Sequence, residues 1–306
     1  MPSWIIKASS QKLLTAIPGY RHWYPWCQRH FFGSLQLSPY FVKDRLEHVG
    51  RHLKAWQQIH PNRLPERVLE FGSGWYPLVP LGLYLCGVKK VVLTDRYQLF
   101  KPADLDKLIN FIEDELWDKL PEILPGFQQA RWKQLKEILQ LAPEQRLSDL
   151  GWTYQVGDIL QKPPTGSFDL LISNNTFEHL APKLLNALMP FFWQCLKPAG
   201  VMSHYVDMVD HYSYFDPSLP AFHFLRFSPR QWSWIENSLQ AQNRWRLDDY
   251  QALWERHQLP IDACWPELLP EDRIAPEQWH PSFHHQSETS TRAGYVQIIS
   301  VKKETP

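Results

Sequence analysis

One short segment of the chain alternates between apolar runs and a glycine turn in a way that few folds accommodate. Arg67–Phe71 is a short apolar run that contains one carboxylate, and Gly72-Ser73-Gly74 follows it directly. Leu78–Cys86 predicts a helix, and Val91–Thr94 predicts a second strand that ends at Asp95. A strand, a tight turn, a helix and another strand form a βαβ unit. Because such units join parallel strands, we expect a parallel sheet.

The same alternation resumes further along the chain. Short apolar runs predict five more strands, at Trp152–Val156, Phe168–Ser173, Val201–Val206, Pro260–Cys264 and Gly294–Val301. Pro182–Leu196 is predicted to be a helix, and residues 197–200 a turn that leads into the next strand. We therefore expect an α/β fold: a Rossmann-like, seven-stranded, mostly parallel sheet flanked by helices.

We expect two domains. Residues 1–66 are predicted to form a helical N-terminal cap rich in aromatic and basic residues, and residues 67–306 the main domain. Within the main domain, residues 96–150 contain two amphipathic patterns that predict a helical insertion after the second strand. Residues 207–245 are rich in loops and aromatic side chains, and we expect them to form a lid on the substrate side.

The composition narrows the class of protein. Of the 306 residues, 44% are hydrophobic and 21% charged, which is typical of a globular protein. The four cysteines form no C-x-x-C pair, which argues against a disulfide framework or a zinc knuckle and favours a reducing, cytoplasmic compartment. The N-terminus lacks a signal-peptide pattern, and the longest apolar run is too short to span a bilayer, so we expect no transmembrane segment.

Charge is unevenly distributed along the chain, although the formal net charge is zero. Residues 1–65 hold nine Lys or Arg and two Asp or Glu, a net charge of +7 that the remainder balances with −7. The same segment contains ten aromatic residues. Basic and aromatic residues together leave nucleic acid, a membrane surface or an acidic substrate open as partners. The alternative interpretation is a helical cap that packs on an acidic body.

The glycine turn and the acid after the second strand point to a nucleoside-containing cofactor. Asp95 follows Gly74 by 21 residues, a spacing at which a strand-end acid can accept both ribose hydroxyls. A dinucleotide fingerprint requires a third glycine where Pro77 stands, which disfavours a nicotinamide oxidoreductase. No Gly-Lys-Ser/Thr follows the turn, so a P-loop is excluded. We expect a cofactor without phosphates.

Five segments in order carry a family resemblance, and they lie between residues 66 and 206. They read VLEFGSG, LTD, GDI, FDLLISNNTFEHL and LKPAG. This series is similar to the class I S-adenosylmethionine-dependent methyltransferases, in particular to the broad type 11-like group. The resemblance implies the fold and S-adenosylmethionine as the cofactor, and it does not imply a substrate.

The resemblance also implies roles for the residues of the first two strands. The turn after the first strand would line the methionine part of the cofactor, with Glu70 near its ammonium, through Glu70, Gly72, Ser73 and Gly74. Asp95 would hold the ribose diol. The family usually continues the turn with small residues, so Trp75-Tyr76-Pro77 departs from its pattern.

Later strands contribute the remaining cofactor residues that the resemblance implies. Asp158 would bind the adenine amino group, and Ile159 would pack on the adenine ring. Asn174, at the end of the fourth strand, would lie beside the cofactor and face the substrate. Turn aspartates are common for other reasons, so a purely local role for Asp158 is the alternative.

Our candidate catalytic residues lie around the ends of the fourth and fifth strands: His179, His204, Asp207 and His211. A histidine can take a proton from an oxygen or nitrogen nucleophile near neutral pH. The His-x-x-Asp-x-x-x-His spacing also suits a divalent metal, and a structural hydrogen-bonded loop is the third interpretation. Among these alternatives we expect no metal site.

We therefore expect an S-adenosylmethionine-dependent methyltransferase that acts on an oxygen or nitrogen of a small or medium organic acceptor. The alternatives are a nucleic-acid or protein methyltransferase that uses the basic N-terminal segment, and a non-catalytic binding module. The fourth motif reads Ser173-Asn174-Asn175-Thr176 and lacks a base-methylating Asn-Pro-Pro-Tyr signature, so we expect no nucleic-acid substrate. Peripheral membrane contact stays open, and the sequence predicts no oligomeric state.

Overall fold

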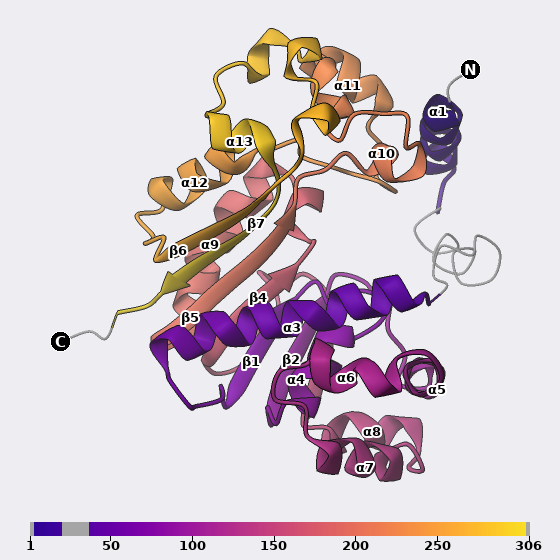
Figure 1. Ribbon diagram of the computed structural model, residues 1–306, viewed down its shortest axis with the longest axis vertical. Helices are drawn as coiled ribbons and strands as arrows, with labels where there is room; N and C mark the ends of the chain where they lie inside the picture. The colour runs from indigo at the N-terminus through magenta and orange to yellow at the C-terminus, as the bar shows by residue number, and fades with distance from the viewer. Residues whose placement is uncertain (1–2, 20–36, 304–306) are drawn as a thin grey trace. The chain divides into compact units, whose positions relative to one another are not determined.

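The computed structural model describes residues 3–19 and 37–303 (Figure 1). The chain packs as two compact units. Of the described residues, unit 1 comprises 3–19, 175–190 and 204–300, and unit 2 comprises 37–174, 191–203 and 301–303. The part of the predicted N-terminal cap between residues 20 and 36 lies outside the described residues.

The described residues form a seven-stranded, mostly parallel sheet in the order β3-β2-β1-β4-β5-β7-β6. Its strands are β1 (Arg67–Phe71), β2 (Lys90–Asp95), β3 (Trp152–Val156), β4 (Phe168–Asn174), β5 (Leu196–Asp207), β6 (Ala263–Leu268) and β7 (Ala293–Val301). β1 pairs in parallel with β2 on one side and with β4 on the other, and β2 pairs in parallel with β3. β6 and β7 are antiparallel. The predicted fold class is confirmed.

The helices of unit 2 cover the β1–β4 part of the sheet. They are α3 (Pro39–Ile59), α4 (Leu78–Leu85), α5 (Asp104–Leu116), α6 (Leu120–Ile123), α7 (Gln129–Ile138) and α8 (Pro143–Asp149), with a 3-10 turn, η1, at Trp117–Lys119. Every residue of α4 is buried, and α3 runs alongside it (Figure 1). Ser38 caps α3 by accepting a hydrogen bond from the amide of Phe41, and Pro39 occupies its first turn.

Unit 1 contains the segment after β5. Its helical elements include α1 (Ser3–Ala16), α10 (His211–Phe215), α11 (Pro229–Ile235), α12 (Leu247–Arg256), α13 (Glu288–Arg292) and the 3-10 turns η2 (Phe177–His179) and η3 (His223–Arg226). α9 (Pro182–Cys195) follows η2. Trp4 of α1 packs in an aromatic core with Tyr212 and Phe227. The guanidinium of Arg246 is buried and donates to the carbonyls of Met208, Ser290 and Ala293.

Two predicted boundaries were wrong. Residues 197–200 were expected as a turn, but β5 begins at Leu196, because Ala199 N donates to Lys302 O at 2.7 Å and Lys302 N donates to Gly200 O at 2.9 Å. The sixth strand was expected at residues 260–264, but β6 spans residues 263–268 and contains Pro266. β6 lies at the end of the strand order, and a sheet edge tolerates a proline because one side of the strand needs no donor.

None of the helices in the described part of the chain combines the length and the apolar character that crossing a membrane requires.

The contact between α3 and α4 gives a stability prediction. A Cβ built on Gly82 would lie 2.5 Å from Val49 Cγ2 and 3.1 Å from Leu124 Cδ2. We expect Gly82→Ala to lower the free energy of unfolding by about 1–3 kcal/mol, because the packed α3–α4 interface must open. A denaturant titration measures this change.

Gly50→Ala is the matched control, since its Cβ would meet only Pro125 at 3.5 Å, within the same helical unit. We expect this variant to be neutral or more stable, by up to about 1 kcal/mol, through helix propensity. Equal destabilisation of both variants would contradict the packing argument.

Candidate functional site

The parallel strands of unit 2 bring three predicted cofactor residues to one edge of the sheet. Glu70 is in register with Leu93 and with Ile172, so β1, β2 and β4 end close together in their shared direction. Glu70, Asp95 and Asn174 stand at or next to the carboxyl ends of these strands. In open α/β sheets this edge is where ligands bind.

The glycine turn is fixed to the neighbouring strand. The amides of Gly72 and Ser73 donate to Thr94 O at 2.9 and 3.1 Å, and the amide of Gly74 donates to Asp95 Oδ2 at 3.0 Å. Gly72 and Gly74 have φ angles of 81° and 66°, a conformation that glycine adopts without strain. Glycine at these two positions therefore lets the turn approach Asp95 without backbone strain.

Glu70 is a buried acid at the centre of this edge. Its side chain is 4% exposed, and Oε2 has no hydrogen-bond partner among the described residues. Burial, assisted by the negative charge of Asp95, raises the pKa of Glu70 to about 8. Glu70 is therefore a neutral acid at pH 7 in the chain alone, and a ligand cation would favour its ionised form. Ser73 Oγ in the same turn is likewise buried without a partner in the described part of the chain.

Asp95 is positioned by backbone donors. Its Oδ2 accepts from Gly74 N and its Oδ1 from Tyr97 N, each at 3.0 Å. Burial raises its pKa, against the effect of these hydrogen bonds. Each carboxylate oxygen has a further lone pair, so the group can still accept from the two hydroxyls of a ribose.

The turn that carries Asp158 follows β3 and is tied to Asp95. Gly157 N donates to Asp95 O at 2.9 Å, and Asp158 Oδ1 accepts from Leu160 N at 3.0 Å. The side chain of Ile159 is buried. The structure thus places Asp158 and Ile159 next to the strand end that carries the ribose candidate, while their contacts with adenine remain a prediction.

Two histidines of α3 join this edge, and neither was among the residues predicted from the sequence. His52 lies 2.8 Å from Ser203 Oγ through Nδ1 and 2.8 Å from Asn174 Oδ1 through Nε2. Since an amide oxygen only accepts, Nε2 carries the proton and Nδ1 accepts from the Ser203 hydroxyl. Burial lowers the pKa of His52 to about 4 and that of His48 to about 2, so both rings are neutral at pH 7.

This polar chain orients Asn174. Its amide oxygen accepts from His52, and its side chain favours the ionised form of Glu70, which partly opposes the rise in the pKa of that acid. Ser203, His52 and Asn174 therefore form one hydrogen-bonded chain, and it ends beside the buried carboxyl of Glu70. A signal was present in the sequence: His48 and His52 are four residues apart on the same helical face as Val49 and Leu53, where a purely apolar stripe would be expected.

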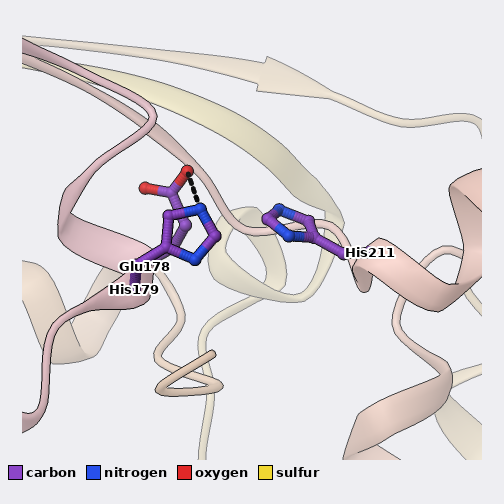
Figure 2. Close-up of side chains that lie close together, drawn as sticks. All are labelled: Glu178, His179 and His211. Atoms are coloured by element: carbon purple, nitrogen blue, oxygen red, sulfur yellow. Dashed lines mark ion pairs between the residues drawn. The ribbon is translucent and has the colours of Figure 1, made fainter. Parts of the chain in front are cut away.

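The predicted catalytic residues fall in unit 1, and two of them lie in one cluster with Glu178 (Figure 2). The rings of His179 and His211 have centroids 5.0 Å apart. His179 Nε2 is 3.9 Å from Glu178 Oε1, and His211 Nε2 is 3.5 Å from Asp207 Oδ2. The side chains of His179 and Asp207 therefore each lie close to the ring of His211.

His204 is separated from solvent. Its side chain is 0% exposed and packs against Phe177, with ring centroids 4.2 Å apart, and against Trp254 at 5.9 Å. Asp207 is also buried and accepts from Val209 N at 2.8 Å and from the Tyr214 hydroxyl at 2.9 Å. Both residues thus have structural contacts in unit 1, and their catalytic role stays a prediction.

No protein-family model and no curated protein matches the chain. Solved structures do. TehB from Haemophilus influenzae is 12% identical with a TM-score of 0.42, and the match covers 82% of this chain and 62% of that one. An S-adenosylmethionine-dependent methyltransferase from Mesorhizobium loti is 17% identical (TM-score 0.43; 81% and 96% covered).

A third similar structure is phosphoethanolamine N-methyltransferase 2 from Haemonchus contortus, solved with S-adenosyl-L-methionine. It is 14% identical with a TM-score of 0.43, and the match covers 90% of this chain and 60% of that one. The chain thus spans about three fifths of the length of the Haemophilus and Haemonchus proteins. Similarities this distant assign neither an activity nor a substrate.

The buried acid gives a prediction for the pH dependence of stability. The pKa of Glu70 rises from an ordinary value of 4.5 to about 8 on folding, so between these values the folded chain holds a proton that the unfolded chain has lost. Stability then falls as pH rises through this window, by up to about 1.4 kcal/mol per pH unit. We expect Glu70→Gln to gain stability relative to the wild type between pH 6.5 and 8.

Urea titrations at several pH values measure this difference. His48 and His52 do not disturb the comparison, because their lowered pKa values confine their effect to pH below about 6.5. Glu66→Gln, at an exposed acid four residues earlier, is the control. Parallel stability curves for Glu70→Gln and the wild type would show that Glu70 is ionised throughout.

Proposed function

We propose that the chain is an S-adenosylmethionine-dependent methyltransferase. The observation that carries this proposal is the buried Glu70 carboxyl, whose Oε2 has no partner in the described part of the chain, at the carboxyl edge of three parallel strands. An acid in this state is suited to a ligand ammonium, which would supply the opposite charge that the surrounding protein lacks.

The residues of unit 2 fit such a cofactor. Glu70 and Ser73 would bind its amino-acid part, the turn at Gly72 and Gly74 allows close approach of the backbone, and Asp95 would accept from the ribose hydroxyls. Asp158 and Ile159 would receive the adenine, as the sequence resemblance implies. Bound S-adenosylmethionine would supply an activated methyl group, and the protein's share of the work is positioning.

Asn174 and His52 would hold this edge in one arrangement. Because the Asn174 oxygen accepts from His52, its amide NH₂ is directed away from that ring and can donate to the ionised Glu70. His52 stays neutral over the physiological pH range, since its lowered pKa is about 4, so Nε2 donates to Asn174 and Nδ1 accepts from Ser203 throughout this range. We propose that Asn174 also limits the position of the acceptor.

On the acceptor side, we propose an oxygen or nitrogen of a small or medium organic molecule. Of the four candidate catalytic residues, His179 and His211 have side chains that reach solvent, with exposures of 41% and 18%. Of these four residues, we therefore propose that only His179 and His211 accept a proton from the acceptor, and only while no metal ion is bound to them, because His204 and Asp207 are buried. Residues 207–245 are the proposed acceptor-binding segment, and we place the reaction in the cytoplasm.

The first test is direct binding of the cofactor. We expect calorimetry to show one S-adenosylhomocysteine bound per chain, and Asp95→Ala to weaken binding roughly 10- to 100-fold, because a charged acceptor for the ribose is lost. Asp149→Ala, at an exposed acid of α8 in the same unit, is the control and should bind like the wild type. Absence of binding by the folded wild-type chain would refute the methyltransferase proposal.

The second test concerns the acceptor. We expect labelled S-adenosylmethionine to transfer its methyl group to a component of a small-metabolite extract, and not to nucleic acid or protein from the same cells. Transfer only to RNA, DNA or protein would replace the small-molecule proposal with the alternative that uses the basic N-terminal segment. Cofactor binding without transfer to any fraction would favour a non-catalytic binding module.

A further inference from the structure

Three side chains of unit 1 converge in a group that the cofactor proposal does not use. Glu178 and His179 belong to η2, and His211 is the first residue of α10 (Figure 2). Each offers one ligand atom, a carboxylate oxygen or an imidazole nitrogen, and these three atoms all lie within 4.8 Å of one another. Two segments that are more than 30 residues apart thus present two imidazoles and one carboxylate to a common point.

Each of the two rings has an oxygen atom close to one of its nitrogens. His179 Nδ1 lies 2.8 Å from the carbonyl oxygen of Ala241, so Nδ1 carries the proton and Nε2 carries the lone pair. It is Nε2 that lies near Glu178 Oε1. On the other ring, His211 Nε2 is 3.5 Å from Asp207 Oδ2. A carbonyl or a carboxylate behind an imidazole is the arrangement that orients histidine ligands in metal sites.

The carboxylate of the group is buried, in contrast to most surface acids. Glu178 is 2% exposed, and its backbone oxygen accepts from Asn243 N at 2.8 Å, which fixes the turn that carries it. Asn175, three residues earlier on the same segment, has a buried Oδ1 without a hydrogen-bond partner among the described residues. A cation at this place would offset the cost of burying the Glu178 charge.

We propose that Glu178, His179 and His211 bind one divalent transition-metal ion. Two nitrogens and one oxygen suit Zn²⁺, Co²⁺ or Mn²⁺ better than Ca²⁺, which takes oxygen ligands almost exclusively. Bonds of about 2.1 Å keep ligand atoms within roughly 4.2 Å of one another, so binding requires only a small rotation of the partly exposed rings. Three protein ligands leave a position for water or an acceptor oxygen.

The ion would change the chemistry of this part of the chain. With an ion bound, the two imidazoles are ligands and not bases, and the ion itself lowers the pKa of a coordinated hydroxyl. The acceptor class that fits is a molecule with a hydroxyl, or with adjacent hydroxyls, able to fill the remaining positions. The metal site itself does not rest on the proposed methyl transfer, since its residues lie in unit 1 and those of the proposed cofactor in unit 2.

The experiment measures metal binding directly, in the full chain and without any methyl donor. The chain is stripped with a chelator and titrated separately with Zn²⁺, Mn²⁺ and Co²⁺ by calorimetry, with the Co²⁺ complex also followed by its visible absorption. We expect one ion per chain for at least one metal. His179→Ala and His211→Ala should each weaken binding at least about 100-fold, since losing a direct ligand exceeds the 10- to 100-fold loss of an outer partner.

His285→Ala is the matched control, because it removes an exposed histidine of the same unit that lies outside the group. It should bind the ion like the wild type. Circular dichroism checks that each variant is folded, and Glu178→Gln tests the carboxylate while keeping its shape. Absence of binding by the wild type, or binding that both histidine variants retain, would overturn the metal site.

Discussion

The parallel pairing of β1 with β2 and with β4 is the constraint on which the candidate site depends. It forces three strands to end in the same direction, so Glu70, Asp95 and Asn174 meet although they are distant in sequence. The short turn after β1 then passes beside Asp95. Positive φ angles at Gly72 and Gly74 allow this conformation. The positions of these three residues thus follow mainly from the topology of the sheet.

The electrostatics of this edge are costly in the absence of a ligand. Glu70 and Asp95 are both largely removed from water, and the nearby negative charge of Asp95 adds to the rise in the pKa of Glu70. The side chain of Asn174 offsets this rise in the pKa of Glu70 only in part, and His52 is itself neutral because burial lowers its pKa. A site with this balance gains most from a ligand that brings a positive charge and hydroxyl donors together. S-adenosylmethionine has both.

The sequence predicted the site residues that are marked by a short local pattern, and it missed those whose contacts depend on the tertiary structure. Asp95 could be predicted from its place at the end of a short apolar strand and its spacing from Gly74, whereas the roles of Glu70 and Asn174 were implied by the family resemblance. His52 was missed, since helical periodicity places it on the buried face of α3 and cannot tell which polar group it will meet there. The approach of Glu178 to His211 was not predicted, because it depends on the path of the long segment between them. Pro266 concealed the second half of β6, since a proline inside a strand is tolerated there only because β6 lies at the sheet edge.

The central claim is that Glu70 receives the ammonium of the cofactor, and proton release tests it most directly. S-adenosylhomocysteine binding would be measured at pH 6.5 in buffers of different ionisation enthalpy, where a free α-amino group is already protonated. Since the pKa of Glu70 is about 8 before binding, the account predicts release of about one proton per bound ligand in the wild type and none in Glu70→Gln. Binding without proton release, or equal release in both proteins, would contradict it.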